Sequence, residues 1–201
     1  MKVRTDAKRD EILAVARAAF LELGYERTSM AEIATRVGGS KATLYGYFAS
    51  KEALFLACIE RLAEQYISPA LAQLEASTDD VRPALRRFGE QFLAFISTQE
   101  SVATYRMVIS QAGHSAIGEA FFEAGPIQID TALARYLSGV MNRGQLRKAD
   151  AAMAATHFLA LLAHGEMWRH YFMNEVPVLT RPQIKRIVDR ALDAFLTGYQ
   201  P

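Results

Sequence analysis

The sequence predicts an all-α protein, and three observations support this class. Apolar residues recur three and four residues apart in nearly every segment, which is the period of one helix face. No segment shows the apolar–polar alternation of a β-strand. Glycine and proline fall between the apolar segments, where helices begin or end. Hydrophobic residues make up 51% of the 201 residues, which is enough for a buried core and argues against disorder.

The first expected helix spans residues 5–23 and is closed by Gly24. Its apolar stripe consists of Ile12, Ala16, Ala19, Phe20 and Leu23. Such a stripe predicts an amphipathic helix with one face against a core.

A second, shorter helix is expected next. Ser29 and Glu32 have the S-x-x-E spacing of a capping box, with Thr28 as an alternative cap. Gly38 and Gly39 end the helix, because glycine tolerates the positive φ that is common at helix C-termini. The apolar positions between them fall at i, i+3, i+4 and i+7: Met30, Ile33, Ala34 and Val37.

A third helix is expected after Ser40, which can cap it. Leu44 and Phe48 form an i, i+4 pair that should face the core. The other faces carry Lys41, Thr43, Tyr45 and Tyr47. Two helices joined by a tight turn follow the helix-turn-helix plan, in which the second helix enters the DNA major groove. By themselves, the two helices fit an ordinary helical hairpin with solvated side chains equally well.

The wider segment separates these alternatives. Three helices in this order, followed by Ser50 as a cap and Lys51 in a fourth helix, resemble the DNA-binding domain of TetR-family transcriptional regulators. The resemblance covers about fifty residues. It rests on Phe20, Gly24, Tyr25, Thr28, Ile33, Ala34, Gly38, Ser40, Thr43, Leu44, Tyr45, Tyr47, Phe48, Lys51 and Leu54.

The resemblance implies roles for individual positions. Base reading is expected from Lys41, Thr43 and Tyr45, because hydroxyl, methyl and amine groups match base edges. Phosphate contacts are expected from Thr28, Ser40, Tyr47 and Lys51.

Two positions depart from the family pattern. Gly39 stands where a bulky apolar residue is usual, so the turn lacks a plug for the core. Gly46 lies inside the third helix, at a cost of about 1 kcal/mol relative to Ala. Gly46 either lets the backbone approach DNA closely or removes a contact.

The charge distribution is consistent with DNA binding. The formal net charge of the whole chain is +1. Residues 1–51 hold nine Lys/Arg and six Asp/Glu, a balance of +3, while the remainder holds fourteen and sixteen, a balance of −2. The modest basic excess therefore lies at the end that is expected to meet DNA.

Everything after residue 50 is expected to be helical, with Pro69 marking a kink or an end. The expected ranges are 50–67, 80–97, 101–112, 115–124, 127–142, 150–173 and a last helix from the Thr180 cap to Tyr199. The expected domains are a DNA-binding domain at residues 1–50 and a helical ligand-binding and dimerisation domain at residues 51–201.

Three segments of the second domain resemble the ligand domain of the AefR-like subgroup of the family. They are YRMVIS at residues 105–110, FFEAGP at residues 121–126 and ALARYL at residues 132–137. This resemblance does not name a ligand.

The last two helices are the expected dimer interface, because their apolar faces are too extensive to leave in water. TetR-like proteins also dimerise through two C-terminal helices. The expected interface residues are Leu159, Leu162, Ala163, Ile184, Ile187, Val188, Ala191, Leu192 and Phe195. The alternative is that these faces complete the core of a single chain.

An effector pocket is expected between helices of the second domain, mostly apolar with a few polar groups. The candidate lining residues are Phe92, Tyr105, Met107, Phe121, Phe122, His164, Met167, Trp168 and Tyr171. For each residue by itself, a place in the ordinary core is the simpler interpretation.

Other classes of function have little support. No nucleophile motif, phosphate loop or HExxH motif is present, so an enzyme is not expected, and neither is a cofactor. His157 and His164 share a helix face without a nearby cysteine, so no metal site is expected. Cys58, the single cysteine, lies between Leu54 and Leu62 and is expected to be buried. Without a signal peptide or a membrane span, a cytoplasmic location is expected.

Together these features predict a homodimeric transcriptional regulator that binds double-stranded operator DNA. The expected regulator is a repressor that a small apolar effector releases. The alternative function is a helical ligand-binding or interaction protein that no longer reads DNA.

Overall fold

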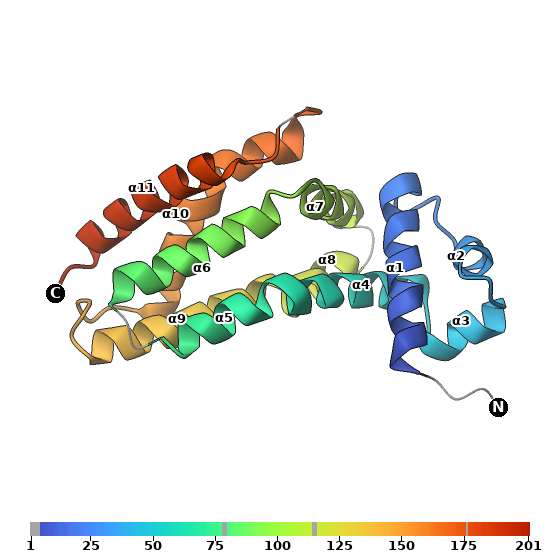
Figure 1. Cartoon of the computed structure of the whole chain (residues 1–201), viewed down its shortest axis with the longest axis horizontal. Helices are drawn as coiled ribbons and strands as arrows, with labels where there is room; N and C mark the ends of the chain where they lie inside the picture. The colour runs from blue at the N-terminus through green and yellow to red at the C-terminus, as the bar shows by residue number, and fades with distance from the viewer. Residues whose placement is uncertain (1–4, 78–79, 114–115, 176) are drawn as a thin grey trace. The chain divides into compact units, whose positions relative to one another are not determined.

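The computed structural model describes residues 5–77, 80–113, 116–175 and 177–201, and these ranges form helices joined by loops (Figure 1). The helices are α1 Asp6–Leu23, α2 Met30–Arg36, α3 Lys41–Tyr47, α4 Lys51–Tyr66, α5 Ser68–Glu75, α6 Val81–Ile96, α7 Gln99–Gln111, α8 Ile117–Ala124, α9 Pro126–Asn142, α10 Ala151–Phe172 and α11 Arg181–Gly198. The all-α prediction is confirmed. Ser115, the expected start of α8, lies outside the described residues.

Hydroxyl side chains cap the first four helices. The Oγ1 of Thr5 accepts from the N–H of Lys8 at 3.3 Å, and the Oγ of Ser29 accepts from the N–H of Glu32 at 3.2 Å. Ser40 caps α3 through the N–H of Thr43 at 3.0 Å, and Ser50 caps α4 through the N–H of Ala53 at 3.1 Å. Each cap satisfies one of the N–H groups that a helix start leaves without an intrahelical partner.

The turn between α2 and α3 depends on Gly38. This residue has φ of 68°, and its N–H donates to the carbonyl of Thr35 at 3.1 Å. The N–H of Gly39 reaches the carbonyl of Ala34 at 3.0 Å. These two bonds form a Schellman motif, which closes α2 and redirects the chain into α3. A β-carbon at Gly39 would meet no heavy atom within 4 Å, so position 39 faces open space instead of a gap in the core.

The chain divides into two compact units. Unit 1 contains Met1–Leu62 and Ala103–Ala124, and unit 2 contains Ala63–Val102 and Gly125–Pro201. Packing thus groups α8, most of α7 and most of α4 with the first three helices, whereas the expected functional boundary followed residue 50. The domain boundary in the functional sense stays a prediction.

The core of unit 1 lies between α1 and the helices that follow it. Ile12, Phe20 and Leu54 are each at most 1% exposed. Three rings meet beside them: the centroids of Phe20 and Phe55 are 5.1 Å apart, and those of Tyr25 and Phe55 are 5.2 Å apart. This apolar cluster holds α1 behind the helix-turn-helix pair and leaves the outer face of α3 in solvent.

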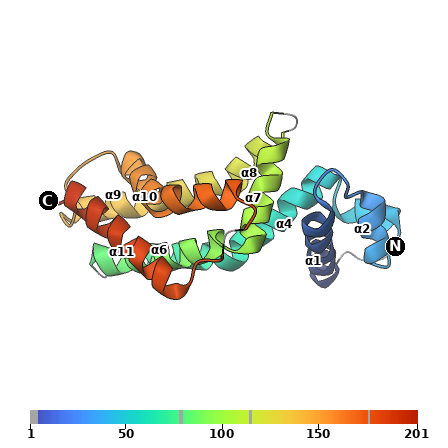
Figure 2. The same ribbon diagram turned by 90° about the horizontal axis from the view of Figure 1, so that it is seen from above.

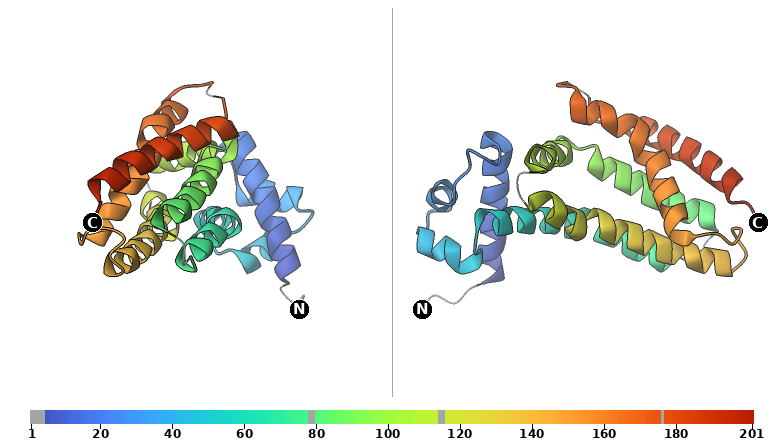
Figure 3. Two further views of the ribbon diagram at one scale, coloured as in Figure 1. Left: turned by 60° about the vertical axis from the view of Figure 1, so that its left-hand side comes forward. Right: turned by 180° about the vertical axis from the view of Figure 1, so that it is seen from behind.

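In unit 2, α6 lies beside α11, and α9 and α11 both pack against α10 (Figures 1 and 2). α5 packs against α6 and α9, and Figure 3 shows α9 and α10 from two further sides. Gly89 allows the close approach of α6, because a β-carbon there would lie 3.2 Å from Leu162 Cδ2 and 3.3 Å from Val188 Cγ1.

α5 was not expected from the sequence as a separate helix. α4 ends at Tyr66, and α5 begins at Ser68 with Pro69 in its first turn. Proline is well tolerated there, since its missing N–H and fixed φ suit the first helical position. The proline that predicted a kink or an end thus also starts the next helix.

The expected dimer-interface residues need a correction. Five of the six on α11 are buried in the core of unit 2, and so is one of the three on α10: Ile184, Val188, Ala191, Leu192, Phe195 and Leu162. Leu159, Ala163 and Ile187 are partly buried and pack against the same core. The six buried residues thus belong to the core of one chain, because α6 packs against α11 and α10. A dimer contact by Leu159, Ala163 and Ile187 stays a prediction.

None of the helices in the described ranges combines the length and the hydropathy that a membrane span requires.

Candidate nucleic-acid interface

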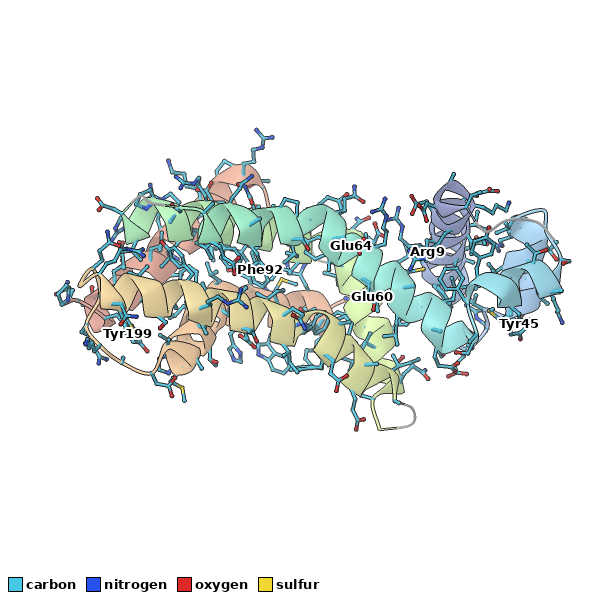
Figure 4. All side chains as sticks on the ribbon, turned by 90° about the horizontal axis from the view of Figure 1, so that it is seen from below. Arg9, Tyr45, Glu60, Glu64, Phe92 and Tyr199 are labelled. Atoms are coloured by element: carbon cyan, nitrogen blue, oxygen red, sulfur yellow. The ribbon has the colours of Figure 1, made fainter. Side chains whose placement is uncertain are left out.

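The outer face of α3 presents the side chains that were expected to read bases. Leu44 and Phe48 point inward and are 2% and 5% exposed. Lys41, Thr43 and Tyr45 lie on the exposed faces, and Tyr45 is 51% exposed (Figure 4). The Tyr45 ring is therefore accessible to a partner, while Leu44 and Phe48 hold the helix against the core.

Ser40 and Thr43 bond to each other as well as capping α3. The Oγ of Ser40 lies 2.9 Å from the Oγ1 of Thr43. This contact orients the Thr43 side chain, which stays exposed. A threonine held in this way offers a methyl group of fixed direction, which suits contact with a thymine methyl.

Thr28 does not match its expected role as a phosphate ligand. Its side chain is 1% exposed, and its hydroxyl lies 2.7 Å from the carbonyl of Gly24 and 3.3 Å from the carbonyl of Ala19. A hydroxyl has only one proton to donate, and these two carbonyl oxygens already accept it, so none is left for a phosphate. Thr28 therefore fastens the end of α1 to the start of α2, and the expectation for Thr28 is corrected.

Lys51 has an internal role that the sequence did not indicate. Its ammonium group donates to the carbonyl of Tyr25 at 3.0 Å and lies 4.1 Å from the centroid of the Tyr25 ring. Burial, together with the neighbouring carboxylate of Glu52, raises the pKa of the Tyr25 hydroxyl. Lysine has three N–H donors, so a phosphate contact by Lys51 stays a prediction alongside this internal role.

Tyr47 meets the start of α1, a contact that sequence reasoning missed. The N–H of Thr5 donates to the Tyr47 hydroxyl at 3.1 Å across 42 residues of chain. Next to it, the guanidinium carbon of Arg9 lies 5.6 Å from the centroid of the Phe48 ring. A contact over this separation leaves no local pattern, because it depends on how α1 crosses the end of α3.

An ion-pair network fastens α2 to α1. The guanidinium of Arg36 lies 2.6 Å from Glu22 and 2.8 Å from Glu32. The Arg36 hydrogen bond and charge hold the pKa of the Glu22 carboxyl below its usual value. Exposed pairs of this kind contribute little stability individually.

The candidate effector-pocket residues fall in both units. Tyr105, Met107, Phe121 and Phe122 belong to unit 1, while Phe92, His164, Met167, Trp168 and Tyr171 belong to unit 2. Phe92 and Met167 are buried in unit 2, and Phe121 packs edge-on against Tyr105 with centroids 5.1 Å apart. Burial raises the pKa of the Tyr105 hydroxyl.

Three of these candidates do not line an interior. Phe122 is 53% exposed and Trp168 is 49% exposed, and His164 is also exposed. The indole Nε1 of Trp168 lies 3.0 Å from a ring nitrogen of His164 on the outer face of α10. The expectation that these three side chains point into a pocket is corrected, since helix periodicity alone did not show which faces of α8 and α10 are covered.

A small void lies within unit 1 and has a volume of about 10 Å³. It holds about one water molecule, so it is too small for an effector in this conformation. Of the candidate effector residues, Met107 lines it. The complete lining is Arg17, Phe20, Leu21, Phe55, Cys58, Ile59, Leu62, Thr104 and Met107.

The histidines that raised the question of a metal site have other neighbours. The Nδ1 of His157 lies 2.8 Å from the Tyr199 hydroxyl, and His164 contacts Trp168. Across the described residues, no cluster of three or more His, Cys, Asp or Glu side chains is placed to hold a metal ion.

These features define a helix-turn-helix transcriptional regulator. Residues 12–58 match the family model described as bacterial regulatory proteins, tetR family, and residues 83–201 match the AefR-like transcriptional repressor, C-terminal domain. The second match covers more than half of the chain, so the protein belongs to the TetR family of transcriptional regulators. Members of this family bind operator DNA as dimers and are regulators, not enzymes.

Curated relatives match over part of their length. The HTH-type transcriptional activator FasR of Mycolicibacterium smegmatis is 36% identical over 103 residues, which cover 51% of this chain and 46% of FasR. The HTH-type transcriptional repressor ComR of Escherichia coli is 36% identical over 77 residues, which cover 38% of this chain and 37% of ComR. The chain thus spans less than half the length of these relatives.

Solved structures match over all or nearly all of the chain. A TetR-family transcriptional regulator from Mesorhizobium loti has a TM-score of 0.87 with 28% identity and covers 100% of both chains. The flavonoid-responsive regulator FrrA has a TM-score of 0.79 with 32% identity and covers 98% of this chain and 99% of its own.

Proposed function

We propose that this chain is a dimeric repressor that reads operator DNA with α3 and that a small apolar effector releases. The exposed outer face of α3 carries the proposal: Tyr45 is 51% exposed while Leu44, its neighbour in sequence, is 2% exposed. The inner face of α3 packs against the core, and its outer face leaves the side chains that we propose read bases open to DNA. Because the operator is chromosomal DNA, the proposal includes a cytoplasmic location.

The base-reading roles go to Thr43, Tyr45 and Lys41, which are all exposed on α3. The methyl of Thr43 suits a thymine methyl, and lysine suits guanine acceptors. Ser40, at the start of α3, and Tyr47, at its end, have hydroxyls that suit phosphate oxygens on either side of the groove. Gly46, the residue before the last of α3, has no side chain, so the backbone there can approach the bases.

The dimer surface is the outer face of α10. Met153, Leu161, Trp168 and Phe172 are 52%, 44%, 49% and 72% exposed, and their spacing of eight, seven and four residues places them on one helix face. The rings of Trp168 and Phe172 stack with centroids 5.1 Å apart.

A second copy of the chain is the proposed occupant of this α10 face. α10 is buried along its inner face and carries a second apolar stripe, Met153 to Phe172, on its outer face, and an exposed apolar patch marks an interaction surface. A stable dimer buries about 1,200–2,000 Å² in total, so neighbouring parts of α11 would also contribute. A dimer has two α3 helices, which could enter two successive major grooves that lie about 34 Å apart on the DNA.

Effector control would act on the spacing of the two α3 helices. A ligand that binds one conformer about 1–3 kcal/mol more tightly than the other shifts enough of the population for control. One relative and one family model support a ligand-responsive repressor: FrrA is described as flavonoid-responsive, and the family model matched by residues 83–201 is described as a repressor. FasR is described as an activator, so the sign of regulation needs its own measurement.

The test is a fluorescence-anisotropy titration of the purified chain against the DNA upstream of its own gene, with shuffled DNA of equal length as the control. Specific binding should exceed binding to shuffled DNA by at least about a thousandfold. Equal binding to both DNAs would reject the DNA-reading proposal and favour a ligand-binding protein. Reporter expression with and without the chain then separates a repressor from an activator.

A further inference from the structure

The start of α1 and the end of α3 form one surface within unit 1. In Figure 1 the N-terminal end of α1 lies beside α3, and two contacts define the junction. The Thr5 N–H donates to the Tyr47 hydroxyl at 3.1 Å, and the Arg9 guanidinium carbon lies 5.6 Å from the Phe48 ring centroid. The position of α1 thus brings a cation and an oriented hydroxyl together at the C-terminal end of the recognition helix.

The hydroxyl of Tyr47 is arranged to donate outward. A hydroxyl has one proton and two lone pairs. Because the oxygen already accepts from the N–H of Thr5, its own proton points away from that bond. Within the part of the chain that the structure describes, no acceptor takes this proton. An external acceptor such as a phosphate oxygen would complete the geometry.

Arg9 differs from the charged residues around it. Lys8 pairs with Glu11 at 2.8 Å, and Asp10 pairs with Arg61 at 3.4 Å. Arg9, which Figure 4 labels, is exposed. Its described contact is with the Phe48 ring. Stacking on a ring restricts the guanidinium while its N–H groups stay open, and planar N–H donors match phosphate oxygens.

We propose that Arg9 and Tyr47 form a phosphate clamp on the DNA backbone beside the groove that α3 enters, with Thr5 as the positioning residue for the Tyr47 hydroxyl. This proposal rests on the proposed function, because it takes α3 as the helix that reads DNA. It adds α1 to the interface, which extends beyond the helix-turn-helix pair. The clamp binds phosphate, so it strengthens binding to every DNA sequence alike.

The first experiment measures the dependence of DNA affinity on salt concentration for the wild-type chain and for Arg9→Gln. Loss of one phosphate contact should lower the slope of log K against log salt by about 1, on both operator and shuffled DNA. Arg143→Gln is the matched control, because Arg143 is an exposed arginine at the end of α9 in unit 2. Arg9→Lys keeps the charge, so it should restore the slope.

The second experiment tests the positioning role of Thr5. Thr5→Ala removes the cap hydroxyl of α1 but keeps the backbone N–H, whereas Thr5→Pro removes both. The difference in affinity between these two variants therefore reports on the N–H bond to Tyr47. In a Tyr47→Phe background this difference should vanish, while a purely structural effect of proline would persist.

The outcomes separate the clamp from the wider function. If the wild-type chain binds neither its operator nor shuffled DNA, the DNA-reading proposal and the clamp both fall. If the wild-type chain binds its operator and Arg9→Gln leaves the salt slope unchanged, the clamp alone is overturned. A slope lowered equally by Arg9→Gln and Arg143→Gln would also reject the clamp, because the effect would then be one of net charge.

Discussion

The ammonium group of Lys51 lies 3.0 Å from the carbonyl oxygen of Tyr25 and 4.1 Å from the centroid of its ring. This relationship joins the first turn of α4 to the loop after α1. Since α3 lies between these two segments in the chain, the contact closes a loop of chain around the recognition helix. Lys51 therefore positions α3 whether or not it also binds phosphate.

Replacing Lys51 with methionine should lower the free energy of unfolding by about 1–2 kcal/mol, because a charge-assisted hydrogen bond and a cation–π contact are lost. Urea denaturation measures this change. Lys148→Met, at an exposed loop residue, is the control and should have little effect.

If Lys51 also binds phosphate, Lys51→Gln should lower the salt slope of DNA binding by about 1. An unchanged slope would limit Lys51 to positioning.

The glycines of the α2–α3 turn should respond differently to alanine. Gly38→Ala should cost about 1–2 kcal/mol, because φ of 68° is unfavourable for a residue with a β-carbon. Gly39→Ala should be neutral or stabilising by about 0.5 kcal/mol, since its φ is not positive and its β-carbon meets nothing within 4 Å. Thermal denaturation of the two variants tests this contrast, which equal destabilisation would contradict.

Thr43 variants should change which operator bases are tolerated. Thr43→Ser keeps the hydroxyl but loses the methyl, so preference for thymine at one position should fall by about 1 kcal/mol. Thr43→Val keeps methyl groups and loses the hydroxyl, so it serves as the matched partner. Titrations against operators changed at one base pair at a time measure the effect. Uniform weakening on every sequence would argue against base reading by Thr43.

Trp168→Glu should weaken the dimer without unfolding the chain, because Trp168 is 49% exposed in a single chain. A central aromatic residue of an interface contributes about 2 kcal/mol or more, which is a loss of at least about thirtyfold in dimer affinity. Analytical ultracentrifugation measures this change. Ile127→Glu is the control, because it also replaces a half-exposed apolar side chain with a carboxylate, but on α9, where Ile127 is 44% exposed. Equal dissociation by both variants, or by neither, would reject the α10 surface.

The Glu22–Arg36 pair predicts part of the acid dependence of stability. Arg36 lowers the folded-state pKa of Glu22, so the pair stabilises the fold above the ordinary pKa of glutamate. This contribution should be lost as the pH falls through the lowered pKa. Glu22→Gln should therefore make the stability curve shallower below pH of about 4.5. Glu175→Gln, at an exposed loop residue, should leave the curve unchanged.

The sequence by itself determined the local structure of this protein. Helix spacing, the serine caps at positions 29, 40 and 50, and Gly38 act over three or four residues, so a single sequence contains their signals. The proposal that α3 reads DNA needed more than this local pattern, because the pattern alone fits an ordinary helical hairpin equally well and the family resemblance extends over about fifty residues.

Only the tertiary structure decided which faces are covered. The apolar face of α11 predicted a dimer contact, yet α6 buries Val188 and Leu192 within one chain. Two other expectations were wrong for the same reason. Thr28 was expected on the surface but is buried, and Trp168 was expected in a pocket but is exposed. Periodicity shows that a helix has an apolar face but not what packs on it. The contact of Thr5 with Tyr47 likewise exists only because folding brings together residues 42 positions apart.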